Sequence, residues 1–227
     1  MRAGAGAPVA DGEGVVYLVR HGEVHNPHAV RYGRLPGYGL SSAGFAQAQS
    51  AAAWLREHAA LPVRAVRSSP LLRARETAAV LRDALAPGEE IALIDALTEL
   101  RTPFDGLPRA AAAHAYARRL VAAIPGRFSA WERHASAALR VLDAARDAAL
   151  ESSRSRGAVV LVSHQAPIWL ACLALEHGYG SARARVSVRL APWRFRGPTP
   201  AYASVTELRF ADPQGEPVRV RYVDCAS

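Results

Sequence analysis

The clearest pattern in the chain is a set of short apolar runs separated by polar, turn-forming stretches. The run from Val15 to Val19 is almost wholly apolar and mostly β-branched or aromatic, as expected of a strand that is buried on both faces of a sheet. The run at 158–162 has the same character. Further strands are predicted at 63–66, 91–94, 203–210 and 218–223.

Between the strands, apolar residues recur at the spacing of helices that cover a sheet. The first helix is expected to open within 40–44, where Ser41 or Ser42 can cap its N-terminus, and to run to about His58. The residues of this helix that are spaced to face the sheet are Phe45, Ala48, Ala52 and Leu55. Other helices are predicted at 71–85, 109–124, 129–151 and 167–177.

Strands that alternate with helices along the chain predict an α/β fold. The expected architecture is a three-layer αβα sandwich with a mostly parallel central sheet. Residues 14–227 are enough to form a single domain with a sizeable core, and residues 1–13 are predicted to be a disordered lead-in.

The charge of the chain is strongly basic, which raises the question of a polyanionic partner. The formal net charge is +8, and all 28 basic residues are Arg, because the chain contains no Lys. Such a bias fits a GC-rich coding sequence as well as it fits selection for polyanion binding, and the arginines are dense only at 183–196. We therefore do not expect nucleic acid as a partner. The role of the Arg-rich segment at 179–201 stays open.

Cysteine content and hydropathy bear on where the protein works. Cys172 and Cys225 are the only cysteines and belong to no CxxC or Cys/His spacing, which favours free thiols in a reducing compartment. Residues 1–14 lack the apolar run of a signal peptide, and the longest apolar stretch, 158–175, is interrupted by polar residues and proline. We expect a cytoplasmic protein with no membrane span.

Polar side chains follow four of the predicted strands at the point where each strand ends. They are Arg20 and His21, Ser68 and Ser69 with Arg73, Glu99, and Ser163 with His164. Because the carboxyl ends of parallel strands meet at one edge of a sheet, we expect these side chains to converge on one crevice. Guanidinium groups bind phosphoryl oxygens in a bidentate manner, a neutral imidazole can attack phosphorus, and a carboxyl in a partly dry pocket can protonate a leaving oxygen. The set predicts phosphoryl transfer.

Four short motifs containing these residues follow one another in a fixed order. They are Arg20-His21-Gly22-Glu23, Leu40-Ser41-Ser42-Ala43-Gly44, Ser69-Pro70-Leu71-Leu72-Arg73-Ala74, and Val162-Ser163-His164. Together they resemble the motifs of the histidine phosphatase superfamily, in its phosphoglycerate mutase-like branch. The resemblance extends from about residue 14 to residue 223 and implies the phosphoglycerate mutase-like fold.

The resemblance implies how the phosphate is bound and transferred. His21 is the implied nucleophile, which becomes a phosphohistidine. Arg20, Arg73 and His164 are the implied phosphate ligands, and His164 also takes part in catalysis. The family chemistry implies no metal and no other cofactor, and the histidines of the chain lack the spacing of metal ligands.

Two further roles follow from the resemblance. An acid is implied after the third strand, and Glu99 is our choice for this proton donor, with Glu23 and Asp105 as the alternatives. The element Phe104-Asp105-Gly106 resembles an aromatic-acid-Gly element of the family and places Glu99 in register. Asn26 resembles a family residue that helps to hold the phosphate.

We predict a metal-independent phosphatase that hydrolyses a small phosphomonoester through phospho-His21. The alternatives are a phosphoglycerate mutase-type phosphotransferase and a non-catalytic phosphate-binding or regulatory module. Tyr32, Arg34 and Tyr38 are candidates for contact with the leaving group. The oligomeric state is open, a homodimer included. Substrate specificity is expected to lie in the loops at 26–39, 100–128 and 179–201.

Overall fold

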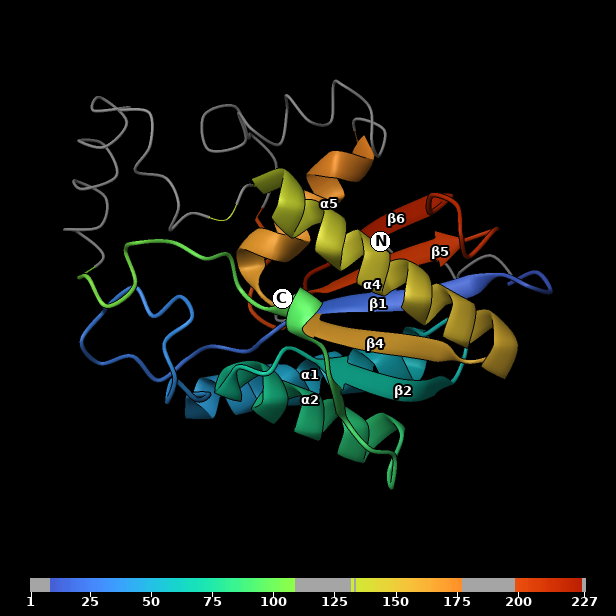
Figure 1. Ribbon diagram of the computed structural model, residues 1–227. Helices are drawn as coiled ribbons and strands as arrows, with labels where there is room; N and C mark the ends of the chain where they lie inside the picture. Colours follow the sequence, from blue (N-terminus) through green and yellow to red (C-terminus); the bar gives the residue numbers. More distant parts are fainter. Residues whose placement is uncertain (1–8, 109–131, 133, 177–198, 226–227) are drawn as a thin grey trace.

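A computed structural model describes residues 9–108, 132, 134–176 and 199–225 of the chain. The helix predicted at 109–124 and most of the Arg-rich segment at 179–201 lie outside these residues, as does much of the lead-in at 1–13. The described residues form a central sheet with helices on both sides (Figure 1).

The sheet has six strands in the order β3-β2-β4-β1-β5-β6. The strands are β1 (Gly14–Arg20), β2 (Val63–Ser68), β3 (Ala92–Leu93), β4 (Ala158–Ser163), β5 (Val205–Phe210) and β6 (Arg219–Val223). β1, β4, β2 and β3 pair in parallel, whereas β5 runs antiparallel to β1 and β6 antiparallel to β5. The predicted α/β fold with a mostly parallel sheet is confirmed, and the antiparallel pairs lie at one edge.

Helices cover both faces of this sheet and complete the predicted three layers. On one face α1 (Ser42–His58) packs beside α2 (Leu72–Leu85), and on the other α4 (His134–Ser155) packs beside α5 (Gln165–Glu176) (Figure 1). A single 3-10 turn, η1 (Asp95–Leu97), follows β3. Of the two serines predicted as the N-cap of α1, Ser41 is the cap, and its side chain accepts a hydrogen bond from the backbone N–H of Gly44.

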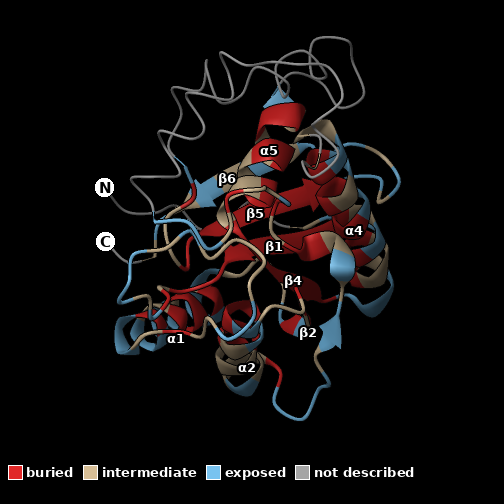
Figure 2. Cartoon of the chain, turned by 60° about the vertical axis from the view of Figure 1, so that its left-hand side comes forward, coloured by how far each residue is buried: buried red, intermediate tan, exposed pale blue. Residues whose placement is uncertain are grey.

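The strand β1 lies at the centre of the core and is buried along its whole length, as Figure 2 shows. Its side chains alternate between the two layers, since Val15, Tyr17 and Val19 pack with α1 and α2. Val16 and Leu18 pack instead with α4 and α5. The strand therefore has no polar face, which explains its continuous apolar sequence.

Some of the predicted boundaries are wrong, for identifiable reasons. The third strand is only Ala92–Leu93, because Ile94 already caps η1. The helix α4 continues to Ser155 through a polar stretch, since the buried Ser152 hydroxyl accepts the backbone N–H of Val15 at 2.8 Å. The helix α5 begins at Gln165, so that Pro167 lies in its first turn, where no N–H is needed. Phe45, which was expected to face the sheet, is 40% exposed.

Two kinds of feature are not found in the described part of the chain. None of its helices combines the length and the apolar character needed to cross a membrane. None of its His, Cys, Asp and Glu side chains form a group of three placed to hold a metal ion.

Candidate active site

The carboxyl ends of β1 and β4 bring two histidines together. In the register of this parallel pair Arg20 lies opposite Ser163, so the following residues, His21 and His164, leave the sheet side by side. The backbone N–H of His21 donates to the carbonyl oxygen of Ser163 at 3.0 Å. The ring centroids are 5.1 Å apart, with the ring planes at 60°, and both rings are buried. Residues far apart in sequence thus share one small space.

The hydrogen bonds of His21 determine which ring nitrogen carries the proton. The Nδ1 atom lies 2.7 Å from the carbonyl oxygen of Gly22, which can only accept, so Nδ1 is the protonated nitrogen. The Nε2 atom therefore keeps its lone pair and accepts from Nε of Arg73 at 3.2 Å. Burial, reinforced by the charges of Arg73 and Arg20, lowers the pKa of His21 well below its usual range. The ring is neutral at pH 7 with its lone pair at Nε2, the form that can act as a nucleophile.

The two arginines are held from both sides by backbone carbonyls and aromatic rings. Arg20 donates to the carbonyl oxygen of Pro200 at 2.6 Å, and its guanidinium carbon lies 3.9 Å from the ring centroid of Tyr202. Arg73 donates to the carbonyl oxygen of Gly33 at 2.7 Å, and its guanidinium carbon lies 4.7 Å from the ring centroid of Tyr32. Burial lowers the pKa of each arginine, yet both remain cationic at pH 7 because a guanidinium deprotonates only at very high pH. No carboxylate forms a salt bridge with either within the described residues.

Each phosphate ligand implied by the resemblance, apart from Asn26, keeps a buried nitrogen without a hydrogen-bond partner among the described residues. These nitrogens are Nε of Arg20, Nη1 of Arg73 and Nδ1 of His164. Buried polar groups in proteins are almost always paired, so each exception requires an explanation. The nitrogens belong to the two arginines and to the ring beside His21, so an anion held there would supply the missing partners.

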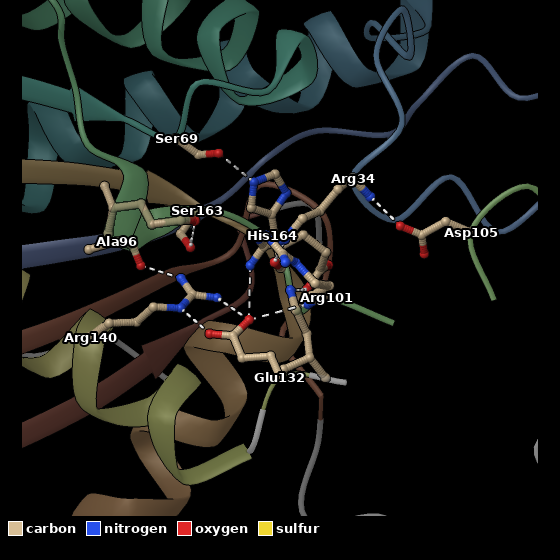
Figure 3. A network of polar contacts seen from close by, with 12 residues as sticks. Arg34, Ser69, Ala96, Arg101, Asp105, Glu132, Arg140, Ser163 and His164 are labelled. Atoms are coloured by element: carbon tan, nitrogen blue, oxygen red, sulfur yellow. Dashed lines mark hydrogen bonds and ion pairs between the residues drawn. The ribbon is translucent and has the colours of Figure 1, made fainter. Parts of the chain in front are cut away.

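The orientation of His164 is fixed by a serine. The hydroxyl of Ser69 lies 2.8 Å from Nε2 of His164, as the dashed line in Figure 3 shows. This contact turns the other ring nitrogen, Nδ1, away from Ser69 and leaves it available. Burial, followed by the charge of Arg73, lowers the pKa of His164 well below its usual range. A neutral His164 whose Nδ1 carries the proton can donate to an anion.

Glu99 is the carboxyl whose electrostatic environment is shared with both arginines. Burial raises the pKa of Glu99. The backbone N–H of Leu100, which donates to Oε1 at 2.6 Å, and the charge of Arg73 both act to lower this pKa, but burial outweighs them. The charge of Arg20 also acts on this carboxyl. A raised pKa keeps a larger protonated fraction of the carboxyl, which is what a proton donor needs.

The alternative donors are occupied in holding loops. The carboxylate of Glu23 accepts the hydroxyl of Ser41 at 2.8 Å, at the N-terminus of α1. The carboxylate of Asp105 accepts the backbone N–H of Arg34 at 2.9 Å and the hydroxyl of Thr102 at 3.0 Å. These contacts favour Glu99 over the other two acids.

The arrangement agrees with a comparison against known protein families. The family model of the histidine phosphatase superfamily (branch 1) matches residues 16–222. The chain belongs to the histidine phosphatase superfamily. The motifs that resembled this family in the sequence are therefore confirmed as family membership, and the superfamily includes enzymes that act on phosphate esters.

Relatives of known sequence or structure agree with this membership. The uncharacterized protein Rv0525 of Mycobacterium tuberculosis is 39% identical over 163 residues, which cover 68% of this chain and 74% of the relative. A mycobacterial glucosyl-3-phosphoglycerate phosphatase matches with a TM-score of 0.63 at 24% identity, over 92% of this chain and 97% of that one. A phosphoglycerate mutase from Bacillus anthracis matches with a TM-score of 0.66 at 16% identity, over 94% of each chain. The structural matches show a shared fold.

Asn26 is placed differently from the other predicted phosphate ligands of this member of the histidine phosphatase superfamily. Its side-chain nitrogen donates to the carbonyl oxygen of Val30 at 2.8 Å, and its side-chain oxygen accepts the N–H of Val30 at 3.2 Å. The amide therefore holds its own loop through its oxygen and one of its two N–H groups. Its role as a phosphate ligand stays a prediction.

Sequence reasoning gave no role to Ser69 and missed Tyr202, although it named Tyr32 as a candidate for contact with the leaving group of this family member. Ser69 was expected at the shared crevice with the other strand-end side chains, but its contact with His164 was not predicted, and Tyr202 was not singled out at all. The ring centroids of Tyr202 and Tyr32 lie 6.0 Å and 6.4 Å from that of His21. Burial and, to a smaller extent, the neighbouring Tyr202 raise the pKa of Tyr32, so its phenol stays protonated. No local pattern marks Tyr202, because it reaches the site only through the antiparallel pairing of β5 with β1.

Proposed function

We propose that this chain is a phosphatase that hydrolyses a small phosphomonoester through a phosphohistidine at His21, without a metal ion. The observation that carries the proposal is the set of unpartnered buried nitrogens on Arg20, Arg73 and His164 beside the lone pair of His21. Leaving a buried donor unpaired costs about 1–3 kcal/mol. A phosphoryl group, with its several acceptor oxygens, pairs with all of these donors at once.

In the first step Nε2 of His21 gives up the hydrogen bond from Nε of Arg73, and its lone pair attacks phosphorus in line with the ester oxygen. The P–N bond forms as the P–O bond to the leaving group breaks. Arg20, Arg73 and His164 donate to the non-bridging oxygens, and the two arginine cations balance the charge on them. Protonated Glu99 gives its proton to the leaving oxygen, so that an alcohol departs.

In the second step a water molecule takes the place of the departed alcohol. Its oxygen attacks the phosphorus of phospho-His21 while the Glu99 carboxylate accepts its proton. The P–N bond breaks, inorganic phosphate leaves, and neutral His21 and protonated Glu99 are restored. The protons balance over the cycle, since Glu99 gives one in the first step and regains one in the second.

Hydrolysis is favoured here over transfer to a second hydroxyl. A mutase must retain the phosphoryl group against water, and neither the loop at 26–39 nor the middle segment of the sequence closely resembles the mutase subfamily. The proposal includes a cytoplasmic location, in line with the reducing compartment that the free cysteines favour.

The test is hydrolysis of p-nitrophenyl phosphate with excess chelator, comparing the wild type with His21→Ala. We expect turnover to survive the chelator and to fall by a factor of about 10³ or more in His21→Ala. The matched control is His58→Ala, at the exposed end of α1, which should retain wild-type turnover. Mass spectrometry of enzyme quenched at alkaline pH should find the phosphoryl group on His21.

The contrary outcomes are distinct. Turnover that is unchanged in His21→Ala would reject the mechanism. A wild type that is silent on a broad panel of phosphomonoesters would reject hydrolysis and point to a mutase or to a non-catalytic phosphate binder.

A further inference from the structure

The guanidinium of Arg34 is turned toward the backbone of the proposed proton donor. Its Nε donates to the carbonyl oxygen of Glu99 at 2.6 Å. Its Nη2 donates to the Glu132 carboxylate at 2.9 Å. The side chain is 27% exposed, so most of it is packed between these partners. Two of the three guanidinium nitrogens are therefore committed to protein groups.

Glu132 accepts hydrogen bonds from two further residues, which hold its carboxylate in place beside Arg34. Nε of Arg140, on α4, donates to its carboxylate at 2.6 Å, and the backbone N–H of Arg101 donates at 3.2 Å (Figure 3). Arg140 also donates to the carbonyl oxygen of Ala96. Burial acts to raise the pKa of Glu132, but the hydrogen bond and charge of Arg140 outweigh it and lower the pKa. Glu132 stays ionised at neutral pH, and the network ties the loop of Glu99 to α4.

The backbone of Arg34 is joined to the phosphate site through its neighbour Gly33. The carbonyl oxygen of Gly33 accepts Nη2 of Arg73 at 2.7 Å, while the N–H of Arg34 donates to Asp105 at 2.9 Å. Gly33 has a φ of +37°, and a Cβ there would lie 1.9 Å from a carboxylate oxygen of Asp105. Only glycine allows this close approach of the loop to Asp105.

We infer that Arg34 is the positioning residue of the proton donor. It fixes the backbone of Glu99 relative to the arginine that holds the phosphate, and thereby sets where the carboxyl can deliver its proton. The inference rests on the proposed function, since it acts through the role given there to Glu99. Arg34 touches no reacting atom in this account, unlike the leaving-group contact that the sequence suggested for it.

A positioning role predicts an effect that depends on the leaving group. A nitrophenolate leaves readily without a proton, whereas the more basic phenolate of phenyl phosphate gains much more from proton donation. The two substrates have nearly the same shape. The parameter to compare is kcat/KM, because it reports the step in which the leaving group departs.

The experiment measures kcat/KM for both substrates in the wild type, Glu99→Gln, Arg34→Met and the double variant. We expect Arg34→Met to lower kcat/KM for phenyl phosphate by about 10–100-fold, the cost of a displaced catalytic group, and that for p-nitrophenyl phosphate by less than about threefold. In the Glu99→Gln background Arg34→Met should cause no further selective loss. Arg154→Met, an exposed position on α4, is the matched control and should leave both values unchanged.

Loss of the salt bridge to Glu132 could also unfold the loop, so a second variant is included. Arg34→Lys keeps the charge, but a single ammonium group cannot reproduce the guanidinium fork that spans Glu99 and Glu132. Arg34→Lys should also lower kcat/KM for phenyl phosphate more than that for p-nitrophenyl phosphate, but by a smaller factor than Arg34→Met. Thermal melting of each variant shows whether it is folded.

The outcomes separate this inference from the proposed function. Equal losses on both substrates in Arg34→Met and Arg34→Lys, with a selective loss in Glu99→Gln, would overturn the positioning role alone. A further selective loss when Arg34→Met is added to Glu99→Gln would also overturn it. A Glu99→Gln variant that affects both substrates equally would instead reject Glu99 as the proton donor, and the inference about Arg34 with it.

Discussion

Gly22 and Gly44 meet backbone to backbone, although they belong to different motifs. A Cβ on Gly22 would lie 2.3 Å from the carbonyl oxygen of Gly44, and a Cβ on Gly44 would lie 2.1 Å from the carbonyl oxygen of Glu23. The N–H of Ser41 donates to the same Glu23 oxygen at 2.9 Å. The segment that carries His21 is thus seated on the N-terminus of α1, and both glycines are needed for the contact.

Substitution of Gly22 by Ala is expected to separate these two segments. The added methyl group has no space unless the backbone moves, and overpacking of this kind costs about 1–3 kcal/mol. Because His21 is the adjacent residue, its ring should be displaced from Arg73 and turnover should fall together with stability. Urea denaturation and hydrolysis of p-nitrophenyl phosphate measure the two effects.

A glycine with more room provides the control for this substitution. In the turn after β5, a Cβ on Gly215 would meet its nearest atom at 3.3 Å. Gly215→Ala should change the free energy of unfolding by less than about 1 kcal/mol and leave turnover unchanged. A Gly22→Ala variant as stable and active as the wild type would show that the contact is not needed.

Replacement of Arg73 by Lys should weaken phosphate binding and turnover although the charge is kept. Arg73 uses Nε on His21 and Nη2 on Gly33, which leaves Nη1 for the substrate, and a single ammonium group cannot do all of this. Loss of one such donor lowers kcat by about 10²–10³-fold. Steady-state kinetics with inorganic phosphate as a competitive inhibitor would measure both turnover and the inhibition constant.

The neighbouring Arg75 tests whether the effect is specific to Arg73. It lies on the same helix, α2, but is exposed. Arg75→Lys should therefore retain the kinetics of the wild type. Wild-type kinetics in Arg73→Lys as well as in Arg75→Lys would indicate that positive charge alone, without the guanidinium geometry, holds the phosphate.

The stability of the protein should fall on mild acidification because of its two buried histidines. Burial is the main cause that lowers the pKa of His21 and of His164 in the folded state. Below about pH 6.5, the usual histidine value, the unfolded chain binds protons that the folded chain does not, so folding loses stability as pH falls. Each unit of pKa depression is worth about 1.4 kcal/mol once the pH lies below the folded-state pKa.

Urea denaturation at several pH values between 7.5 and 5 measures this loss, and variants assign it. His164→Gln should flatten the dependence on pH, whereas His58→Gln, at an exposed position, should leave it as it is. Glu99 acts in the opposite direction, since a raised carboxyl pKa makes the folded state bind more protons, but it is one group against two. A stability that is flat over this range in the wild type would contradict the assignment.

Much of the fold could be predicted from local sequence patterns. The unbroken apolar run of β1 identified a strand buried on both faces, and the cap of α1 was narrowed to Ser41 or Ser42, because both signals lie within a few residues. The boundaries that were wrong depend on distant partners. The last turns of α4 include Ser152, whose hydroxyl accepts the N–H of the distant Val15, and Phe45 is exposed although its helical spacing matched that of the buried Ala48.

The sequence by itself determined which chemical groups stand at the ends of the strands, and so the family and the class of chemistry. A strand period and a short motif are local properties that any fold must respect. Only the tertiary structure decided that the register of β1 and β4 places His21 beside His164, that Tyr32 and Tyr202 stack on the two arginines, and that Arg34 turns toward Glu99. These contacts join residues far apart in the chain, and their geometry follows from packing and loop closure, which no local pattern encodes.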